Sequence, residues 1–212
     1  MLKSFKGAAA LALGLALSQA GVAMAATPPA AAPPNITFGT KDASLAPAGA
    51  YGLDSKHAGV IARVSHIGYS YSIFRFDDVK GSLTWDPAKP ADSKLSVTVK
   101  TDSIDTNVEG FAEELEGAKY LNAKAYPEAT FVSTAFRPTD ATHGQVDGTF
   151  TLMGKTVPLT FDVSLVGAGK GFGAPRMGVN ATTSIKPSDF GLSPMFATPI
   201  ELVIDVEFVK GQ

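Results

Sequence analysis

Apolar and polar residues alternate one by one along several stretches of this chain. Four such stretches are LSVTV (95–99), VDGTFTL (146–152), VPLTFDVSL (157–165) and LVIDVEF (202–208). Successive side chains of a β-strand point to opposite faces, so each stretch predicts a strand with one dry face and one wet face. No stretch has the long apolar run of a buried parallel sheet. The pattern therefore predicts an all-β, antiparallel protein.

Turn-forming residues separate the predicted strands at Asp86-Pro87, at Gly144, at Gly154 and in the glycine run after Gly167. We count about eight strands, and an antiparallel sheet of this size closes economically into an up-and-down barrel because closure removes the exposed sheet edges. An eight-stranded barrel is either filled by its side chains or holds one small ligand. A β-sandwich is the alternative, and the alternation alone does not separate the two folds.

One segment departs from the two-residue period. Thr106 and Glu109 have the spacing of a capping box, which marks the start of a helix. Phe111 and Leu115 would then share one helix face, and Gly117 is expected to end the helix. The sequence therefore predicts one short helix inserted into the β-sheet protein.

The N-terminus has the three parts of a secretory signal peptide. Lys3 and Lys6 form a positive region, residues 7–17 form an apolar stretch too short to cross a bilayer comfortably, and Ala-Met-Ala at 23–25 forms a cleavage site. The chain has no cysteine, so neither a disulfide nor a lipid anchor on cysteine is expected. We therefore expect cleavage after Ala25 and a soluble periplasmic product.

The chain is expected to have three regions, which are the signal peptide (1–25), an Ala/Pro-rich flexible leader (26–50) and the barrel domain (51–212). Cleavage would remove two lysines and no acid, so the formal charge would change from −2 to −4. This mildly acidic chain offers no general attraction to nucleic acid or to anionic membranes. We expect no nucleic-acid partner and no stable membrane insertion.

The residues that could support catalysis or metal binding lack the necessary spacing. His57 and His66 lie nine residues apart without a third suitable ligand, and Ser65 points to the opposite strand face from His66. The run GAGKGFG (167–173) lacks the spacing of a phosphate-binding loop, and a flexible hairpin is the better interpretation. The pattern favours a binder of an apolar small molecule without a catalytic residue, a metal ligand or a cofactor. A structural barrel with a filled core is the alternative.

An ordered set of motifs extends over almost all of residues 51–209. These motifs are KHA (56–58), VIARVSHIGYS (60–70), GSLTWD (81–86), VTVKTDSIDTN (97–107), AKYLNAKAYPEATFVSTAF (118–136), DGTFTLMGKTVPLTFDV (147–163) and IKPSDFG (185–191). In this order and spacing the chain resembles the YceI family of bacterial periplasmic polyisoprenoid-binding proteins.

The resemblance implies a lipocalin-like, eight-stranded antiparallel up-and-down barrel with one short inserted helix. Its elongated apolar cavity would hold an isoprenoid lipid, such as a polyprenyl phosphate or the tail of a respiratory quinone. A fatty acid or fatty amide is the alternative ligand, and an enzyme that modifies the bound lipid is the alternative function. By family analogy a membrane-bound cytochrome b561-type protein is a candidate partner, and the resemblance leaves a homodimer open.

The candidate ligand-binding residues combine the inward strand faces with the inserted helix. They are Ala62, Val64, His66, Phe74, Phe76, Trp85, Val97, Val99, Phe111, Leu115, Tyr120, Phe131, Phe150 and Phe161. Alternation places His66 on the same strand face as Ala62 and Val64, so we expect its ring to point inward near the strand end. There it would contact either the ligand or only the core.

Two departures from the family pattern concern the ligand. Ala62 stands where the family usually has a large aromatic residue, which predicts a wider cavity. The helix lacks the basic residue that the family commonly carries and has Phe111-Ala112 and Glu114-Leu115 in its place. An anion in an apolar cavity needs a cation or several donors. We therefore expect a neutral head group, such as a quinone, held by His66 or Tyr120.

Overall fold

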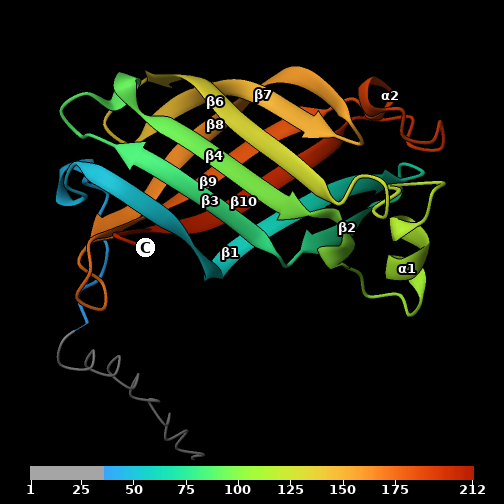
Figure 1. Ribbon diagram of the computed structural model, residues 1–212, viewed down its shortest axis with the longest axis horizontal. Helices are drawn as coiled ribbons and strands as arrows, with labels where there is room; N and C mark the ends of the chain where they lie inside the picture. The colour runs from blue at the N-terminus through green and yellow to red at the C-terminus, as the bar shows by residue number, and fades with distance from the viewer. Residues whose placement is uncertain (1–35) are drawn as a thin grey trace, which may run out of the picture. The chain divides into compact units, whose positions relative to one another are not determined.

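The computed structural model describes residues 36–212, so the predicted signal peptide and residues 26–35 of the leader lie outside the described residues. Ten antiparallel strands form one sheet (Figure 1). They are β1 (Gly49–His66), β2 (Ser70–Phe76), β3 (Val79–Trp85), β4 (Lys94–Lys100), β5 (Ile104–Asp105), β6 (Glu128–Pro138), β7 (His143–Leu152), β8 (Lys155–Gly169), β9 (Arg176–Ile185) and β10 (Ile200–Lys210).

The ten strands form eight rows that close into a barrel. β2 and β3 lie end to end along β1, with Val60 opposite Phe76 and Gly52 opposite Ser82. β5 extends the row of β4 in the same way, because it pairs with β2 as β4 pairs with β3. Each row pairs with the next along the chain, and β10 returns to pair with β1. The predicted eight-stranded antiparallel up-and-down barrel is confirmed, and closure distinguishes it from the sandwich.

The predicted strand faces agree with the packing. On β10, Leu202, Val206 and Phe208 are buried while Asp205 on the opposite face is exposed. One predicted turn is misplaced, because Gly144 is the second residue of β7 and pairs with Pro138. The turn itself lies at residues 139–142, where the Asp140 carboxylate accepts hydrogen bonds from the backbone N–H groups of Thr142 (2.7 Å) and His143 (2.8 Å).

The inserted helix is shorter than predicted. α1 spans Phe111–Glu116 and follows Gly110, whose φ of 74° is left-handed. The predicted capping box is wrong, because the Thr106 hydroxyl accepts from the backbone N–H of Val108 (3.2 Å) in a turn that precedes the helix. The left-handed residue interrupts the helix there, since a helix needs negative φ throughout. Leu115 is buried, as an inward helix face requires.

A second short helix, α2 (Pro187–Phe190), was not predicted. Three single-turn 3₁₀ helices, η1 (Ala43–Leu45), η2 (Pro90–Asp92) and η3 (Thr101–Ser103), complete the described elements. None of the described helices is long and apolar enough to cross a membrane. All of these helices are short, so strand pairing holds most of the barrel together.

The predicted boundary of the leader at residue 50 is wrong. Thr40 forms a β-bridge with Ala168, η1 follows, and β1 begins at Gly49. Ala46 is completely buried, and its carbonyl accepts a hydrogen bond from Nε1 of Trp85 (3.1 Å). An Ala/Pro-rich segment shows no periodicity of its own, and its order comes from packing against the barrel end.

Candidate functional site

The interior of the barrel contains a cavity of about 770 Å³. Inward side chains from β1–β4 and β6–β10 form its wall, and these side chains are almost all aliphatic or aromatic. Phe131 of β6 and Phe161 of β8 meet edge to face, with ring centroids 5.0 Å apart. Offset and edge-to-face rings pack well, so this pair fixes one side of the wall.

Eight of the fourteen predicted ligand-binding residues line the cavity. They are Ala62, Phe76, Trp85, Val97, Val99, Phe131, Phe150 and Phe161. Alternation assigned six of them to inward strand faces, and Phe76 and Phe131 came from the family motifs. The role of each residue in ligand binding stays a prediction.

Five other predicted residues pack in the core at the barrel end that carries α1. They are Val64, Phe74, Phe111, Leu115 and Tyr120. Phe74 lies directly opposite Ala62 across β1 and β2, and its ring is 6.1 Å from that of Phe111. The hydroxyl of Tyr120 donates to Oε1 of Glu114 (3.2 Å) and so is already used. These side chains close the barrel end instead of lining the cavity.

The predicted contact of His66 with the ligand or the core is not seen. His66 is exposed and is the last residue of β1, just before the turn into β2. Alternation fixes the side of the sheet, but the hairpin of β1 and β2 continues beyond the closed part of the barrel. The inward face there has no opposite wall, so His66 lies in solvent and does not line the cavity.

Most polar groups of the cavity lie at the barrel end opposite α1, and the sequence analysis missed them. They come from η1 with its flanks and from the β6–β7 turn, and they include Lys41, Asp42, Ser44, Asp140, Thr142 and His143. The only local sequence signal was Asp140 two residues before Thr142, which is typical of an Asx turn. That signal predicts a turn but not its position at a cavity mouth.

Two of the charged groups at this mouth, Arg137 and His143, already pair with carboxylates. The guanidinium of Arg137 donates two hydrogen bonds to Asp147, at 2.7 and 2.6 Å. Nδ1 of His143 lies 3.0 Å from Asp140. Hydrogen bonds from the backbone N–H of Thr142 and from His143 lower the pKa of Asp140 to about 2. Lys41 is then the one lining cation that pairs with no carboxylate among the described residues, so the mouth offers polar contacts without a cluster of free cations.

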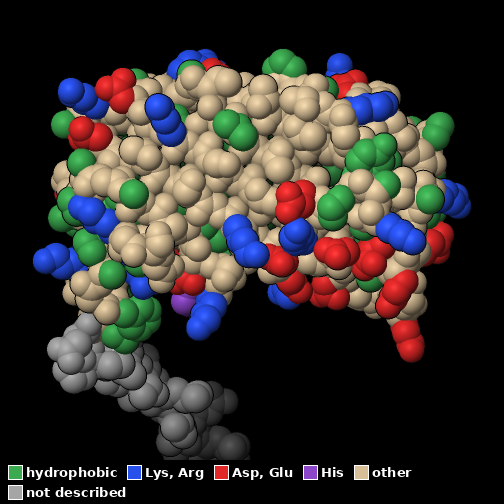
Figure 2. Space-filling view, in the orientation of Figure 1, with side chains coloured by type: hydrophobic (Ala, Val, Ile, Leu, Met, Phe, Trp, Pro, Cys, Tyr) green, Lys and Arg blue, Asp and Glu red, His purple; other side chains and the backbone are tan. Residues whose placement is uncertain are grey.

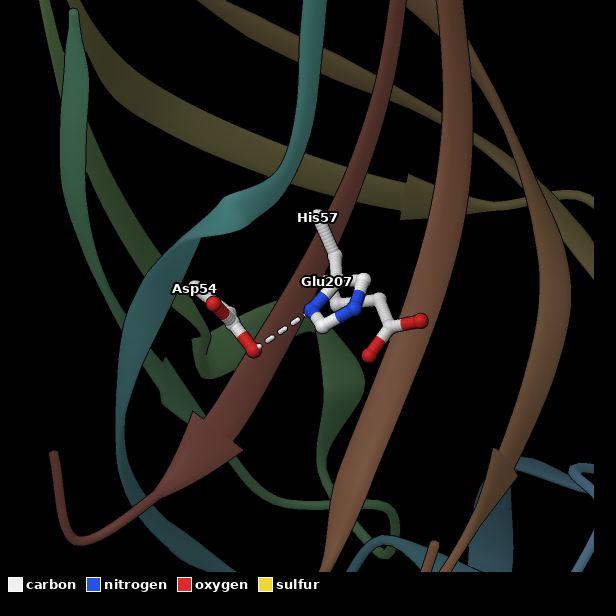
Figure 3. A group of neighbouring side chains, drawn as sticks. All are labelled: Asp54, His57 and Glu207. Carbon is white, nitrogen blue, oxygen red and sulfur yellow. Dashed lines mark hydrogen bonds and ion pairs between the residues drawn. The ribbon is translucent and has the colours of Figure 1, made fainter.

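A second group of polar side chains lies away from the cavity, at a bulge in β1 between Leu53 and Ala58. Asp54 and His57 of the bulge approach Glu207 of β10 (Figure 3), and their ligand atoms lie within 4.8 Å of one another. Nδ1 of His57 is 2.9 Å from Oδ2 of Asp54.

This group could hold a metal ion only in competition with an existing cation. The guanidinium of Arg176 already donates to Oε2 of Glu207, at 2.7 Å. A fixed positive charge next to a carboxylate opposes the approach of another cation. The pair of Arg176 and Glu207 joins β9 to β10, the pair of His57 and Asp54 lies within the bulge, and the charge of Arg176 also helps to lower the pKa of Asp54. We therefore interpret the group as neighbouring ion pairs on the barrel wall.

Comparison with known proteins agrees with this architecture. Residues 51–208 match the YceI-like domain. A UPF0312 protein of Pseudomonas putida (strain W619) is 41% identical over 207 residues, which cover 95% of this chain and 96% of that protein. The crystal structure of the Campylobacter jejuni YceI protein is similar, with a TM-score of 0.63 and 28% identity, covering 70% of this chain and 91% of that chain.

A further solved structure has the same fold at lower identity. It is described as a polyisoprenoid binding domain from Saccharophagus degradans implicated in plant cell wall breakdown, with a TM-score of 0.55 and 15% identity, covering 76% of this chain and 98% of that chain. The identity to the Pseudomonas relative and the domain match over most of the chain decide the family. This chain belongs to the YceI family.

Proposed function

We propose that this protein is a periplasmic carrier that holds one isoprenoid lipid in the barrel and does not modify it. The observation that carries the proposal is the continuous apolar wall around a cavity of about 770 Å³. Small-molecule sites usually measure roughly 300–1,000 Å³ and bury most of their ligand. Burial of an apolar chain is favourable by about 25 cal/mol per Å² removed from water, so the wall supplies affinity without specific contacts.

The distribution of polar groups supports binding without chemistry. Among the described lining residues, the charged side chains lie toward the mouth, whereas Val97, Phe131 and Phe161 are typical of the middle of the wall. Acid–base catalysis needs polar groups that converge on one reacting atom. The name of the Saccharophagus domain, a polyisoprenoid binding domain on the same fold, supports an isoprenoid as the ligand class.

The two ends of the cavity suggest an orientation for the ligand. Apolar side chains such as Leu115 and Phe190 close the α1 end, while η1 and the β6–β7 turn supply polar atoms at the other end. The tail would therefore point toward α1 and the head toward η1. Since Arg137 and His143 already pair with carboxylates and Lys41 alone is left to meet an anion, the mouth suits a neutral head with one or two hydrogen-bonding atoms better than a pyrophosphate. A respiratory quinone has such a head.

A competition titration between a long-tailed quinone and a polyprenyl pyrophosphate of similar tail tests this proposal. We expect the quinone to bind more tightly, with little difference between about 0.05 and 0.5 M salt, because screening acts on exposed ionic contacts. Tighter pyrophosphate binding that weakens steeply with salt would overturn the neutral head. Preferential binding of a fatty acid or a fatty amide would overturn the isoprenoid assignment while leaving the cavity as the site.

Two neighbouring residues of β4 provide a matched pair of variants for the same titration. Val97 lines the cavity, whereas Thr98 does not. Val97→Trp adds an indole to the cavity, and we expect it to weaken ligand binding by at least about tenfold, which corresponds to ~1.4 kcal/mol. Thr98→Trp adds the same group to the outer face and should leave binding unchanged. Equal affinities for the two variants would place the ligand outside the barrel.

The periplasmic location has a separate test. Cleavage after Ala25 predicts a mature chain that begins at Ala26 and is released by osmotic shock. Recovery of a cytoplasmic chain that still begins at Met1 would contradict the location without affecting the cavity. Native mass spectrometry of the freshly purified protein, followed by organic extraction, would identify the lipid that it carries.

A further inference from the structure

A lipid that enters the cavity must pass one end of the barrel, because the rows of strands pair all around it. At the α1 end, Leu115, Tyr120 and Phe190 are exposed by 5% or less and form a packed core. Acidic side chains also gather on the outside of α1 (Figure 2), so an apolar tail would have to cross a charged surface there. The polar mouth lies at the opposite end, beside η1 (blue in Figure 1), and is therefore the better route.

Two segments border this mouth, and the β6–β7 turn is the more firmly fixed of them. Within the turn, the backbone N–H of Thr139 donates to the carbonyl of His143 (2.9 Å). The turn is also tied to β8, since the N–H of Leu165 donates to the carbonyl of Thr142 (2.7 Å). Two backbone N–H groups donate to the carboxylate of Asp140 inside it. Movement of the turn would therefore break hydrogen bonds of the sheet.

The second segment is residues 41–45, which contain η1 and which we call the arch. Its hydrogen bonds are local, because the backbone N–H of Leu45 donates to the carbonyl of Asp42 (3.2 Å) and that of Ser44 donates to the Asp42 carboxylate (3.0 Å). Among the described residues, no backbone hydrogen bond joins the arch to a strand. Four of its five residues are exposed. Segments with few contacts to the core open at a low cost in free energy.

The arch is attached to the barrel at its two ends, and the two attachments differ. After the arch, Ala46 is completely buried in the core. Before the arch, Thr40 and Ala168 form an isolated bridge with two backbone hydrogen bonds, at 3.0 and 2.8 Å. One further bond, from the N–H of Thr37 to the carbonyl of Gly171, is longer, at 3.3 Å. The side of Thr40 is therefore the weaker attachment.

We propose that the arch is a lid, which turns outward about Ala46 when the bridge between Thr40 and Ala168 breaks, and so lets the lipid pass the mouth. Lys41 and Ser44 line the cavity, so closure also completes the polar surroundings of the head group. Opening leaves the ten strands paired and breaks only the few bonds before the arch. The use of this opening for lipid exchange rests on the proposed carrier function, whereas the opening itself does not.

A disulfide across the bridge tests the lid. The chain has no cysteine, so Thr40→Cys combined with Ala168→Cys introduces a single pair. Residues that exchange both hydrogen bonds in an antiparallel pair have Cα atoms about 5.5 Å apart, a distance that a disulfide can span. We expect the oxidised variant to take up and to release a long-tailed quinone at least about tenfold more slowly than the reduced one. Dithiothreitol should restore both rates.

The matched control is a disulfide in the barrel wall. Asn180 of β9 and Asp205 of β10 are also directly opposite each other, so Asn180→Cys with Asp205→Cys should leave both rates unchanged. Equal rates before and after oxidation of the bridge pair would overturn the lid. Loss of equilibrium affinity on oxidation, with recovery on reduction, would overturn it as well, because the lipid would then displace the arch instead of lying beneath it.

Hydrogen exchange tests the opening without a lipid. The N–H of Ala168 is bonded to the carbonyl of Thr40 and its residue is 1% exposed, so it exchanges when the bridge opens. We expect it to exchange at least about tenfold faster than the N–H of Val146, which lies within β7. Equal protection of the two groups would overturn the lid. Fast exchange at Ala168 in a protein that binds no quinone would support the opening and refute the carrier function.

Discussion

Gly148 of β7 gives the sharpest test of the cavity wall, because a methyl group added there has no space. A Cβ atom at this position would lie 2.4 Å from Cζ of Phe131 and 2.5 Å from the backbone carbonyl oxygen of Val132. Ordinary contacts of a Cβ atom begin at 3.4 Å, so the ring must move by about 1 Å. Phe131 cannot move freely, since its exposed fraction is 6% and it packs against Phe161.

The expected cost of Gly148→Ala follows from these contacts. Overpacking of a core usually costs about 1–3 kcal/mol, and contact with both a ring and a backbone carbonyl places this site near the upper value. Replacement of a glycine returns about 0.4–1 kcal/mol through the unfolded chain. We therefore expect a net loss of about 2–3 kcal/mol in the free energy of unfolding, measured by urea denaturation at constant m-value.

Other strand glycines give graded controls for the same measurement. At Gly81 the nearest atom to an added Cβ would be 3.0 Å away, and at Gly178 and Gly59 it would be 3.8 and 3.9 Å away. We expect a small loss for Gly81→Ala and no loss, or a gain of up to ~1 kcal/mol, for the other two. A Gly148→Ala variant as stable as the Gly178→Ala variant would refute the packing of Phe131 over β7.

Two further predictions test the sheet register and the bulge of β1. Val97→Asp should lower the free energy of unfolding by several kcal/mol, because the new carboxylate would face the apolar wall. Thr98→Asp should lower it little, because residue 98 lies opposite Lys80 on the outer face. Equal urea midpoints for the two variants would mean that the predicted register is wrong by one residue. The hydrogen bond from His57 lowers the pKa of Asp54 in the folded protein. The ionised carboxylate therefore stabilises the fold above about pH 4, the usual pKa of Asp. This stabilisation is lost as the pH falls through the lowered pKa of the folded state. Asp54→Asn should therefore show a shallower loss of stability between roughly pH 5 and pH 2 than the native chain, and parallel curves would contradict the assignment.

The two-residue period predicted the parts of the fold that depend on strands alone. Val97, Phe150 and Phe161 line the cavity as the alternation requires, because the side of a sheet that a residue faces is a local property. His66 obeys the same alternation and is nevertheless exposed, since burial also requires an opposite wall. The period therefore assigns a face, and only the closure of the barrel decides whether that face is inside.

The errors outside the strands have another physical origin. The segment before β1 carries no periodic pattern, yet Ala46 is completely buried and accepts a hydrogen bond from Trp85. Its order depends on a residue about forty positions away, which local composition does not encode. The same dependence hid the polar mouth, because η1 and the β6–β7 turn meet only when β8 brings Ala168 to Thr40 and Leu165 to Thr142.

The existence of a cavity, as opposed to a filled core, follows from which rows face each other across the barrel. An eight-stranded barrel is narrow enough for side chains to fill, so space remains only where small residues lie opposite large ones. The ring order places β7 opposite β1, and β7 presents Phe150 and Gly148 while β1 presents Ala62. Ala129 of β6 and Ala181 of β9 are also small and line the cavity. The volume is thus a property of the pairing topology, and substitutions at the three alanines should change ligand size before they change the fold.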